Sequence, residues 1–409
     1  MKSQENQWAW PDYVAVIGGG RWARVLIEVV CSLTPMSVKI SVHSPRNFSA
    51  MEGWVVARGL EDRIRVCSDY PKSIAGKRGA VIVANAARDH EKAIEWALHQ
   101  GLPVLAEKPV TLSFFATQRM IDLADSQNTY LATAHVFLFA SYIETFSKLV
   151  SNEKSIVSVR VLWSDPQIES RYGEAKNYDP GLPIYADWLP HIISILKTFT
   201  AGPAILSENI GFYKGGSHLI INLLYGQIPC QIEIARNHNS RQRIIEVNTE
   251  NKKITLDFGS EPGVICINAK VLYDDGDWDR NPKPVSNMLS AFLKAAVGGS
   301  CDARLDCLIG LSASQLIDQT AALYRAALFP WLNGELNKHQ DAISSDLRYA
   351  LAEILQMNDL ESIAPMEQRI NYLYRHLKEI MLATNDATIK FVDDTVKIII
   401  KKGNNTSYL

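Results

Sequence analysis

The sequence lacks any apolar run near the length of about 20 residues that a bilayer span requires. It also lacks an excess of charge of either sign, because 42 basic and 44 acidic residues leave a formal net charge of −2. We therefore expect neither a membrane nor a nucleic acid as a partner. The polar N-terminus, MKSQENQWAWPD, has no apolar core of a secretory signal. These absences predict a soluble, cytoplasmic protein.

Cysteine is scarce, and its spacing excludes the common cysteine sites. None of the six cysteines forms a C-x-x-C pair, and none lies near a histidine at zinc-finger spacing. We expect reduced structural thiols and no metal site. What the chain does have is apolar material, with 47% hydrophobic residues over 409 positions. That length predicts two or three domains.

The first third of the chain alternates short apolar runs with amphipathic stretches. The runs are residues 13–18, 38–44, 79–85, 102–107 and 130–135, and the clearest helical stretches are 89–101 and 113–128. Apolar runs with little polar alternation are typical of parallel strands covered on both faces. Residues 1–136 are therefore predicted to form an α/β domain with a doubly wound parallel sheet, a Rossmann fold.

The pattern changes after about residue 155. Strand-like runs follow one another with few helices between them, which predicts a second domain, residues 137–332, with a large, mostly antiparallel sheet. The runs are residues 155–163, 207–215, 217–226, 228–236, 243–258 and 264–275, and the helical segments are 183–199, 285–299 and 309–328. Phe329-Pro330 and Asn333-Gly334 predict a break after the last helix.

The remainder, residues 338–409, is interpreted as a short α/β appendage. Residues 344–358 and 366–382 show helical periodicity, and residues 387–402 resemble a hairpin with Asp393 and Asp394 at its tip. The appendage could pack on the main body, extend a subunit contact or bind a partner protein, and the sequence does not decide among these.

The strongest local motif is a glycine loop between a strand and a helix. In the motif Gly18-x-Gly20-x-x-Ala23, Gly18 permits a tight turn and Gly20 lets the backbone approach a pyrophosphate. Ala23 allows the helix to pack closely on the strand. The N-terminus of the helix, where Arg21 and Trp22 lie, would hold the diphosphate. A dinucleotide-binding loop is the favoured interpretation, although such loops also occur for steric reasons alone.

The end of the second strand bears on which dinucleotide is bound. Domains that prefer NAD usually place a carboxylate there for the ribose 2′-hydroxyl, but residues 42–47 contain none. Ser44 and Arg46 could instead donate to a 2′-phosphate, which favours NADP(H) over NAD(H). The alternative is that Ser44 belongs to a simple turn and Arg46 is a solvated surface charge.

Glu107-Lys108-Pro109 follows the strand at residues 102–107, at the sheet edge where ligands of open α/β sheets bind. A lysine at this edge could hold a substrate oxygen and stabilise charge as a hydride moves. Taken alone, Lys108 could equally be an ordinary lysine at a strand end.

Several motifs together resemble the Gfo/Idh/MocA family of NAD(P)-dependent oxidoreductases, which includes glucose–fructose oxidoreductase and inositol dehydrogenases. They are the glycine loop, VIVANAARDH, AEKP and a later D-x-x-x-H, and the resemblance covers approximately residues 12–330. It implies a homodimer or homotetramer and adds Asn85, His90 and Glu107 to the expected cofactor contacts. The chain departs from the family pattern at Ala87, Pro190 and Ser194.

The D-x-x-x-H motif is Asp187 and His191, and a spacing of four places both on one face of a helix. The resemblance implies that His191 is the acid/base and that Asp187 orients the substrate. Pro190 must lie in the first turn of this helix or distort it. Without the family, such a pair is more often structural than catalytic.

A polar loop before this helix carries the candidates for substrate binding, which are Trp163, Arg171, Tyr172, Tyr178 and Tyr185. Aromatic rings and an arginine could bind a sugar or another small polar ring, or could merely anchor the loop. The favoured function is hydride transfer between NADP(H) and a carbinol or ketone carbon of a sugar, cyclitol or related intermediate. The alternatives are an imine reductase and, less favoured, a non-enzymatic dinucleotide-sensing regulator.

Overall fold

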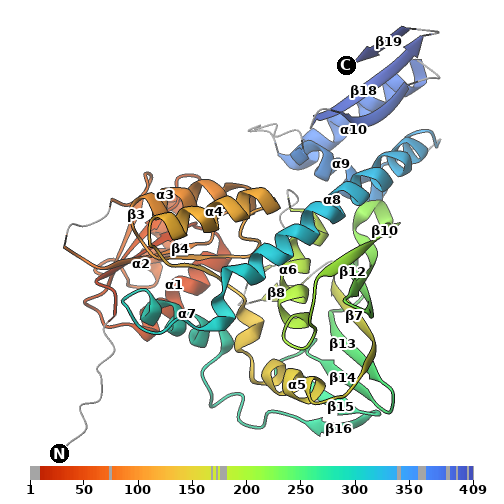
Figure 1. Cartoon of the computed structure of the whole chain (residues 1–409). Helices are drawn as coiled ribbons and strands as arrows, with labels where there is room; N and C mark the ends of the chain where they lie inside the picture. The colour runs from red at the N-terminus through yellow and green to blue at the C-terminus, as the bar shows by residue number, and fades with distance from the viewer. Residues whose placement is uncertain are drawn as a thin grey trace, which may run out of the picture.

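A computed structural model describes residues 10–72, 76–166, 169–171, 174–175, 182–338, 342–357, 365–383, 387–392, 395–402 and 405–408. Two large sheets lie side by side, and a long helix, α8, runs between them toward the C-terminal appendage (Figure 1). This arrangement confirms the predicted fold class. No helix among these residues has the length and apolarity that a bilayer span requires.

The first sheet has six parallel strands in the order β3-β2-β1-β4-β5-β6. The strands are β1 (Tyr13–Ile17), β2 (Lys39–His43), β3 (Ile64–Cys67), β4 (Gly79–Val83), β5 (Val104–Ala106) and β6 (Leu131–Thr133). The connecting helices are α1 (Arg21–Leu33), α2 (Phe48–Ala57), α3 (His90–His99) and α4 (Phe114–Ser126). The order reverses beside β1, which is the switch point where open α/β sheets bind ligands.

Both faces of this sheet are covered, as its apolar strands predicted. Val14 and Val16 pack with α1 and α2 on one face, whereas Ala15 and Ile17 pack with α3 and α4 on the other. The apolar runs of the sequence predicted five of the six strands. The missing one, β3, is a four-residue edge strand with one exposed and two half-buried positions, too short to show a clear apolar run.

The second sheet has eight strands in the order β10-β11-β12-β7-β13-β14-β15-β16. They are β7 (Ile156–Pro166), β10 (Ala204–Tyr213), β11 (His218–Tyr225), β12 (Ile228–His238), β13 (Gln242–Thr249), β14 (Lys253–Asp257), β15 (Val264–Ile267) and β16 (Lys270–Tyr273). Among these described strands only β12 and β7 pair in parallel, and the other pairs are antiparallel. A two-stranded ribbon, β8 (Ser170–Arg171) and β9 (Glu174–Ala175), follows β7.

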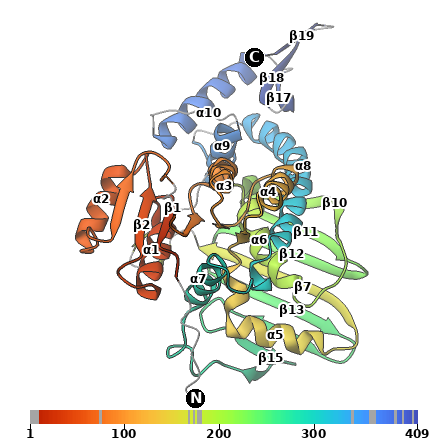
Figure 2. The same ribbon diagram turned by 60° about the vertical axis from the view of Figure 1, so that its left-hand side comes forward.

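The helices that follow β6 are α5 (Ser141–Ser151), α6 (Ile184–Leu196), α7 (Pro284–Ala295) and α8 (Cys307–Leu336), of which α7 packs against α1 of the first domain. Helix α6 is apolar nearly all round and is buried nearly all round, between α8 and the inner face of the sheet (Figure 2). It therefore holds its side chains in fixed positions beside the Rossmann strands.

The appendage consists of α9 (Ser345–Met357), α10 (Met366–Ala383) and an antiparallel sheet of β17 (Ala387–Val392), β18 (Thr395–Lys402) and β19 (Asn405–Tyr408). The two predicted helices and the hairpin are present, and β19 adds a strand that was not predicted. Asp393 and Asp394, the expected tip, lie outside the described residues. Helix α9 packs on the main body rather than standing apart from it.

One proline interpretation needs correction. The predicted break at Phe329-Pro330 is wrong, because α8 continues through Pro330 to Leu336. Burial explains this, since Leu332 and Leu336 lie in the core and compensate for the lost backbone hydrogen bond. Pro190 lies in the second turn of α6, not the first, and the helix continues past it.

The continuation of α8 leads to a stability prediction. Replacing the fully buried Leu332 by alanine should lower the free energy of unfolding by about 2–5 kcal/mol, since the substitution leaves a cavity beyond the proline. The same change at Leu308, which is 52% exposed on the same helix, should cost less than about 0.5 kcal/mol. Urea denaturation of both variants measures the difference, and equal losses would contradict a packed C-terminal half of α8.

Candidate active site

A cavity of about 780 Å³ opens between the carboxyl ends of the Rossmann strands and the second sheet. Its lining combines residues from helix α1, which follows the glycine loop, from the ends of β4 and β5, from helix α6 and from strand β12. Gly18, Gly20 and Ala23 themselves are not among the described residues that line it. Of the predicted site residues, the cavity is lined by Arg21, Trp22, Asn85, His90, Glu107, Lys108, Asp187 and His191. The fold thus brings to one space two sets of motifs that are at least 79 residues apart in the sequence.

The glycine loop has the geometry that a dinucleotide phosphate needs. Gly18 has a φ of +137°, and a Cβ there would lie 2.5 Å from the carbonyl oxygen of Ala84. Gly20 is the N-cap of α1 and makes no side-chain cap. It has open space where a Cβ would stand, and the first turn after it has no acidic residue. The helix N–H groups and dipole are therefore available to an anion, and Ala23 is buried against the sheet as predicted.

The two residues expected at a 2′-phosphate lie in different surroundings. Ser44 is buried, and its hydroxyl occupies the space where a Cβ on Gly19 would lie. Arg46 is exposed over 61% of its side chain and forms an ion pair with Asp89 at 3.5 Å. Neither is among the described residues that line the cavity.

Glu107 and His90 fix the loop that carries Lys108. The indole Nε1 of Trp22 donates to Oε1 of Glu107 at 2.6 Å, and burial raises the pKa of this carboxyl above its usual value. The ring of His90 contacts the carbonyl oxygens of Pro109 at 2.8 Å and Asn85 at 3.2 Å. The strand ends of β4 and β5 are thereby tied to each other and to α1.

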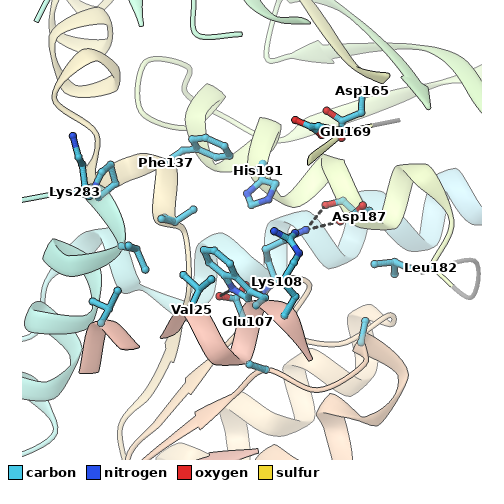
Figure 3. Close-up of a pocket in the computed structure, with 18 of the residues that line it drawn as sticks. Val25, Glu107, Lys108, Phe137, Asp165, Glu169, Leu182, Asp187, His191 and Lys283 are labelled. Carbon is cyan, nitrogen blue, oxygen red and sulfur yellow. Dashed lines mark hydrogen bonds and ion pairs between the residues drawn. The ribbon is translucent and has the colours of Figure 1, made fainter. Parts of the chain in front are cut away.

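Lys108 and Asp187 form the central contact of the cavity (Figure 3). The Nζ atom of Lys108 donates to Oδ1 of Asp187 at 2.6 Å and to its backbone oxygen at 2.9 Å. The other carboxylate oxygen, Oδ2, accepts from Nη2 of Arg236 at 2.9 Å. Burial alone would raise the pKa of Asp187, but the charges of Lys108 and Arg236 hold it well below its usual range.

His191 lies one turn further along α6, and its ring is fixed by aromatic neighbours. Trp163 stacks with it at 5.9 Å between ring centroids, and Phe137 meets it edge-on at 4.9 Å. Within the described part of the chain, Nδ1 of His191 has no hydrogen-bond partner. Burial, reinforced by the charge of Lys108, lowers the pKa of His191 well below its usual value, so its ring is neutral.

Not every predicted substrate residue reaches the cavity. Trp163 is 1% exposed and packs behind His191, and Tyr185 is buried against Tyr324. Tyr172 and Tyr178 lie outside the described residues, as does the side chain of Arg171. The wall of the cavity beside β7 instead carries Asp165, which pairs with Arg243 of β13, and Glu169, which pairs with Arg241 in the turn before β13.

Arg236 is a site residue that the sequence motifs did not single out, although a signal for it exists. In β12 the buried positions alternate through Ile232 and Ile234, so the next position of that face, Arg236, points inward. An inward charge at the end of an apolar face needs a partner, and here the partner is Asp187. The alternation of apolar residues along β12 predicts that Arg236 points inward, but only the fold shows that its partner is Asp187.

Comparison with known proteins identifies the first domain. Residues 13–135 match the model of the Gfo/Idh/MocA oxidoreductase family, described as an NAD-binding Rossmann fold. The first domain is therefore a Rossmann domain of the Gfo/Idh/MocA oxidoreductase family. A search of curated proteins found no match. The resemblance inferred from the motifs is confirmed.

Solved structures of similar fold cover about three quarters of this chain. UDP-N-acetylglucosamine 3-dehydrogenase from Acidithiobacillus ferrooxidans is 14% identical with a TM-score of 0.61, covering 77% of this chain and 98% of its own. GenD2 of gentamicin A biosynthesis, in complex with NAD, is 18% identical with a TM-score of 0.60, covering 78% and 95%. A mutant of a 3-ketoreductase from Actinomadura kijaniata, in complex with NADP, is 16% identical with a TM-score of 0.60, covering 76% and 96%. At these identities the likeness concerns the fold.

The buried position of His191 predicts its titration. At about pH 5.5, one unit below the ordinary histidine value of about 6.5, its ring should still be neutral. Long-range nitrogen–proton NMR spectra of the ¹⁵N-labelled protein, with a His191→Gln variant for assignment, measure this directly. A titration midpoint at or above the ordinary value would contradict the described environment.

Proposed function

We propose that the protein is an NADP(H)-dependent oxidoreductase that transfers a hydride between the cofactor and a carbinol or ketone carbon of a sugar, cyclitol or related biosynthetic intermediate. The observation that carries the proposal is the position of Lys108, in a cavity bordered on one side by helix α1, which follows the glycine loop, and on the other by Asp187 and His191. Structural neighbours that are a sugar-nucleotide dehydrogenase and a ketoreductase support this substrate class.

Lys108 suits the role of binding the reacting oxygen. An ammonium group has three N–H donors, and Asp187 accepts two of them through Oδ1 and its backbone oxygen. One donor of Lys108 is left for a ligand oxygen in the cavity. As an alcohol is oxidised, the positive charge of Lys108 stabilises the negative charge that develops on that oxygen.

His191 suits the role of base in the same direction. Because its ring is neutral, it can accept the proton of the substrate hydroxyl, and the reverse reaction returns the proton. Phe137 and Trp163 keep the ring from turning away. Asp187 fixes Lys108 and so sets where the reacting oxygen binds. When bound, the nicotinamide ring supplies or accepts the hydride.

The preference for NADP(H) rests on the sequence at the end of β2, because residues 42–47 include no carboxylate of the kind that binds a ribose 2′-hydroxyl. Arg46 is exposed there and can turn toward a phosphate, because its pairing with Asp89 at the surface is weak. Ser44 offers a buried hydroxyl below the glycine loop.

We also propose that the chain forms homo-oligomers through the outer face of the second sheet. Ile205 and Leu224 are cross-strand partners on β10 and β11, and both are exposed, at 56% and 43%. Exposed apolar pairs on a broad sheet favour contact with another subunit.

Removing the amine of Lys108 tests the catalytic assignment. The Lys108→Ala variant should bind NADPH with unchanged affinity but lose turnover by a factor on the order of 10² to 10⁴, because the developing charge loses its partner. Turnover is followed by the absorbance of the reduced cofactor, with a panel of sugar nucleotides, free sugars, cyclitols and cyclic imines as substrates.

The matched control is Lys148→Ala, which removes an exposed lysine paired with Glu144 and should behave as the parent protein. Near-full turnover by Lys108→Ala would overturn the assignment. If only the imines are turned over, the assigned reaction becomes reduction of a C=N bond instead of hydride transfer at a carbinol or ketone carbon.

The cofactor preference is tested by Arg46→Ala. Loss of the guanidinium should weaken NADPH binding by about tenfold and leave NADH binding within a factor of about two, since only NADPH carries the 2′-phosphate. Fluorescence titration measures both affinities. Arg160→Ala, on the second sheet, serves as the control for a general change of charge. Equal weakening of both cofactors, or of neither, would argue against NADP(H) recognition by Arg46.

A further inference from the structure

Helix α9 of the appendage is part of the protein core. Every side chain from Tyr349 to Leu355 is buried. The first turn of α9 packs against the turn after β10, where the carbonyl oxygen of Asp346 occupies the space that a Cβ on Gly215 would need. Two side chains with polar groups, Tyr349 and Glu353, therefore point into the core, where each polar group needs a partner.

Arg236 joins these appendage residues to the active site. Its Nη2 atom donates to Oδ2 of Asp187 at 2.9 Å, and its Nη1 atom donates to the hydroxyl of Tyr349 at 3.4 Å and to the carbonyl oxygen of Leu182 at 2.9 Å. The guanidinium side chain is only 3% exposed. A buried arginine is held in one orientation by the acceptors around it, so Tyr349 helps to fix the group that holds Asp187.

Glu353 completes the chain of contacts. It accepts a hydrogen bond from the hydroxyl of Tyr324 on α8 and forms another with Tyr349. When Tyr349 donates its proton to Glu353, its oxygen is left to accept from Arg236. Burial raises the pKa of Glu353 to about 7, so the carboxylate is ionised at pH 8. Charges then alternate from Lys108 through Asp187 and Arg236 to Glu353.

We propose that Tyr349 and Glu353 of the appendage are positioning residues of the active site, which act through Arg236 on Asp187 and Lys108. The expected effect on turnover rests on the proposed function, whereas the coupling of Tyr349 and Glu353 to Asp187 does not. The appendage is thus a structural part of the catalytic site. Loss of either residue frees Arg236 to shift, and Asp187 and Lys108 shift with it.

The test is a double-mutant cycle at pH 8 in the full-length protein. Tyr349→Phe removes a single hydroxyl and Asp187→Asn a single charge, and these two residues share Arg236 as a partner. Urea denaturation of the parent, both single variants and the double variant gives their unfolding constants. We expect the fold-change in the unfolding constant of the double variant to be about tenfold smaller than the product of the fold-changes of the two single variants. Additive effects would overturn the proposal.

Turnover provides the second measurement. Tyr349→Phe should lower kcat about tenfold with unchanged NADPH affinity, and should have no further effect in the Asp187→Asn background. Glu353→Gln, which keeps the shape of the side chain, should behave in the same way. Tyr372→Phe, at a tyrosine that is 74% exposed on α10, is the matched control.

The outcomes separate this inference from the proposed function. Parental turnover in Tyr349→Phe and Glu353→Gln, with Lys108→Ala inactive, would overturn the positioning role and leave the proposed function standing. Parental turnover in both Lys108→Ala and Asp187→Asn would overturn the proposed function, while the unfolding constants would still decide whether the appendage is coupled to Asp187.

Discussion

The ion pair between Lys108 and Asp187 is the contact on which the site depends, because it joins the two halves of the molecule. Lys108 follows β5 of the Rossmann sheet, and Asp187 lies on α6, which packs on the second sheet. Arg236 from β12 shares the same carboxylate. Two largely buried cations thus share one anion, and removal of Asp187 would deprive both of that counter-charge.

Neighbouring side chains hold the Lys108–Asp187 ion pair in place and position His191 beside it. Trp22 and Glu107 brace the loop of Lys108 from the side of the nucleotide-binding helix. Trp163 and Phe137 brace His191 from the side of the second sheet. The cavity therefore presents a cation and a neutral imidazole from rigid elements on either side, an arrangement suited to charge stabilisation and proton transfer at one carbon–oxygen bond.

Local sequence patterns sufficed to predict most of the fold, but they failed where burial overrides them. Apolar runs and helical periodicity predicted five of the six Rossmann strands, the antiparallel sheet and both appendage helices, whereas β3 was too short to stand out. The course of α8 through Pro330 was missed, because local proline rules carry no information about the burial of Leu332. In the site, the glycine loop was predicted from its own motif, whereas Lys108 and the Asp187/His191 pair were singled out through the resemblance to the family, because neither motif is decisive alone. Arg236 belongs to no motif, and its role comes from contacts with Asp187 and Tyr349, which lie 49 and 113 residues away in the sequence.

The most direct test of the central claim is a crystal structure of the protein with NADP⁺ bound. We predict a diphosphate at the N-terminus of α1 and a nicotinamide ring in the cavity, with C4 facing the space between Lys108 and His191. A nicotinamide ring that points away from Lys108, or a cofactor bound outside the cavity, would contradict the claim.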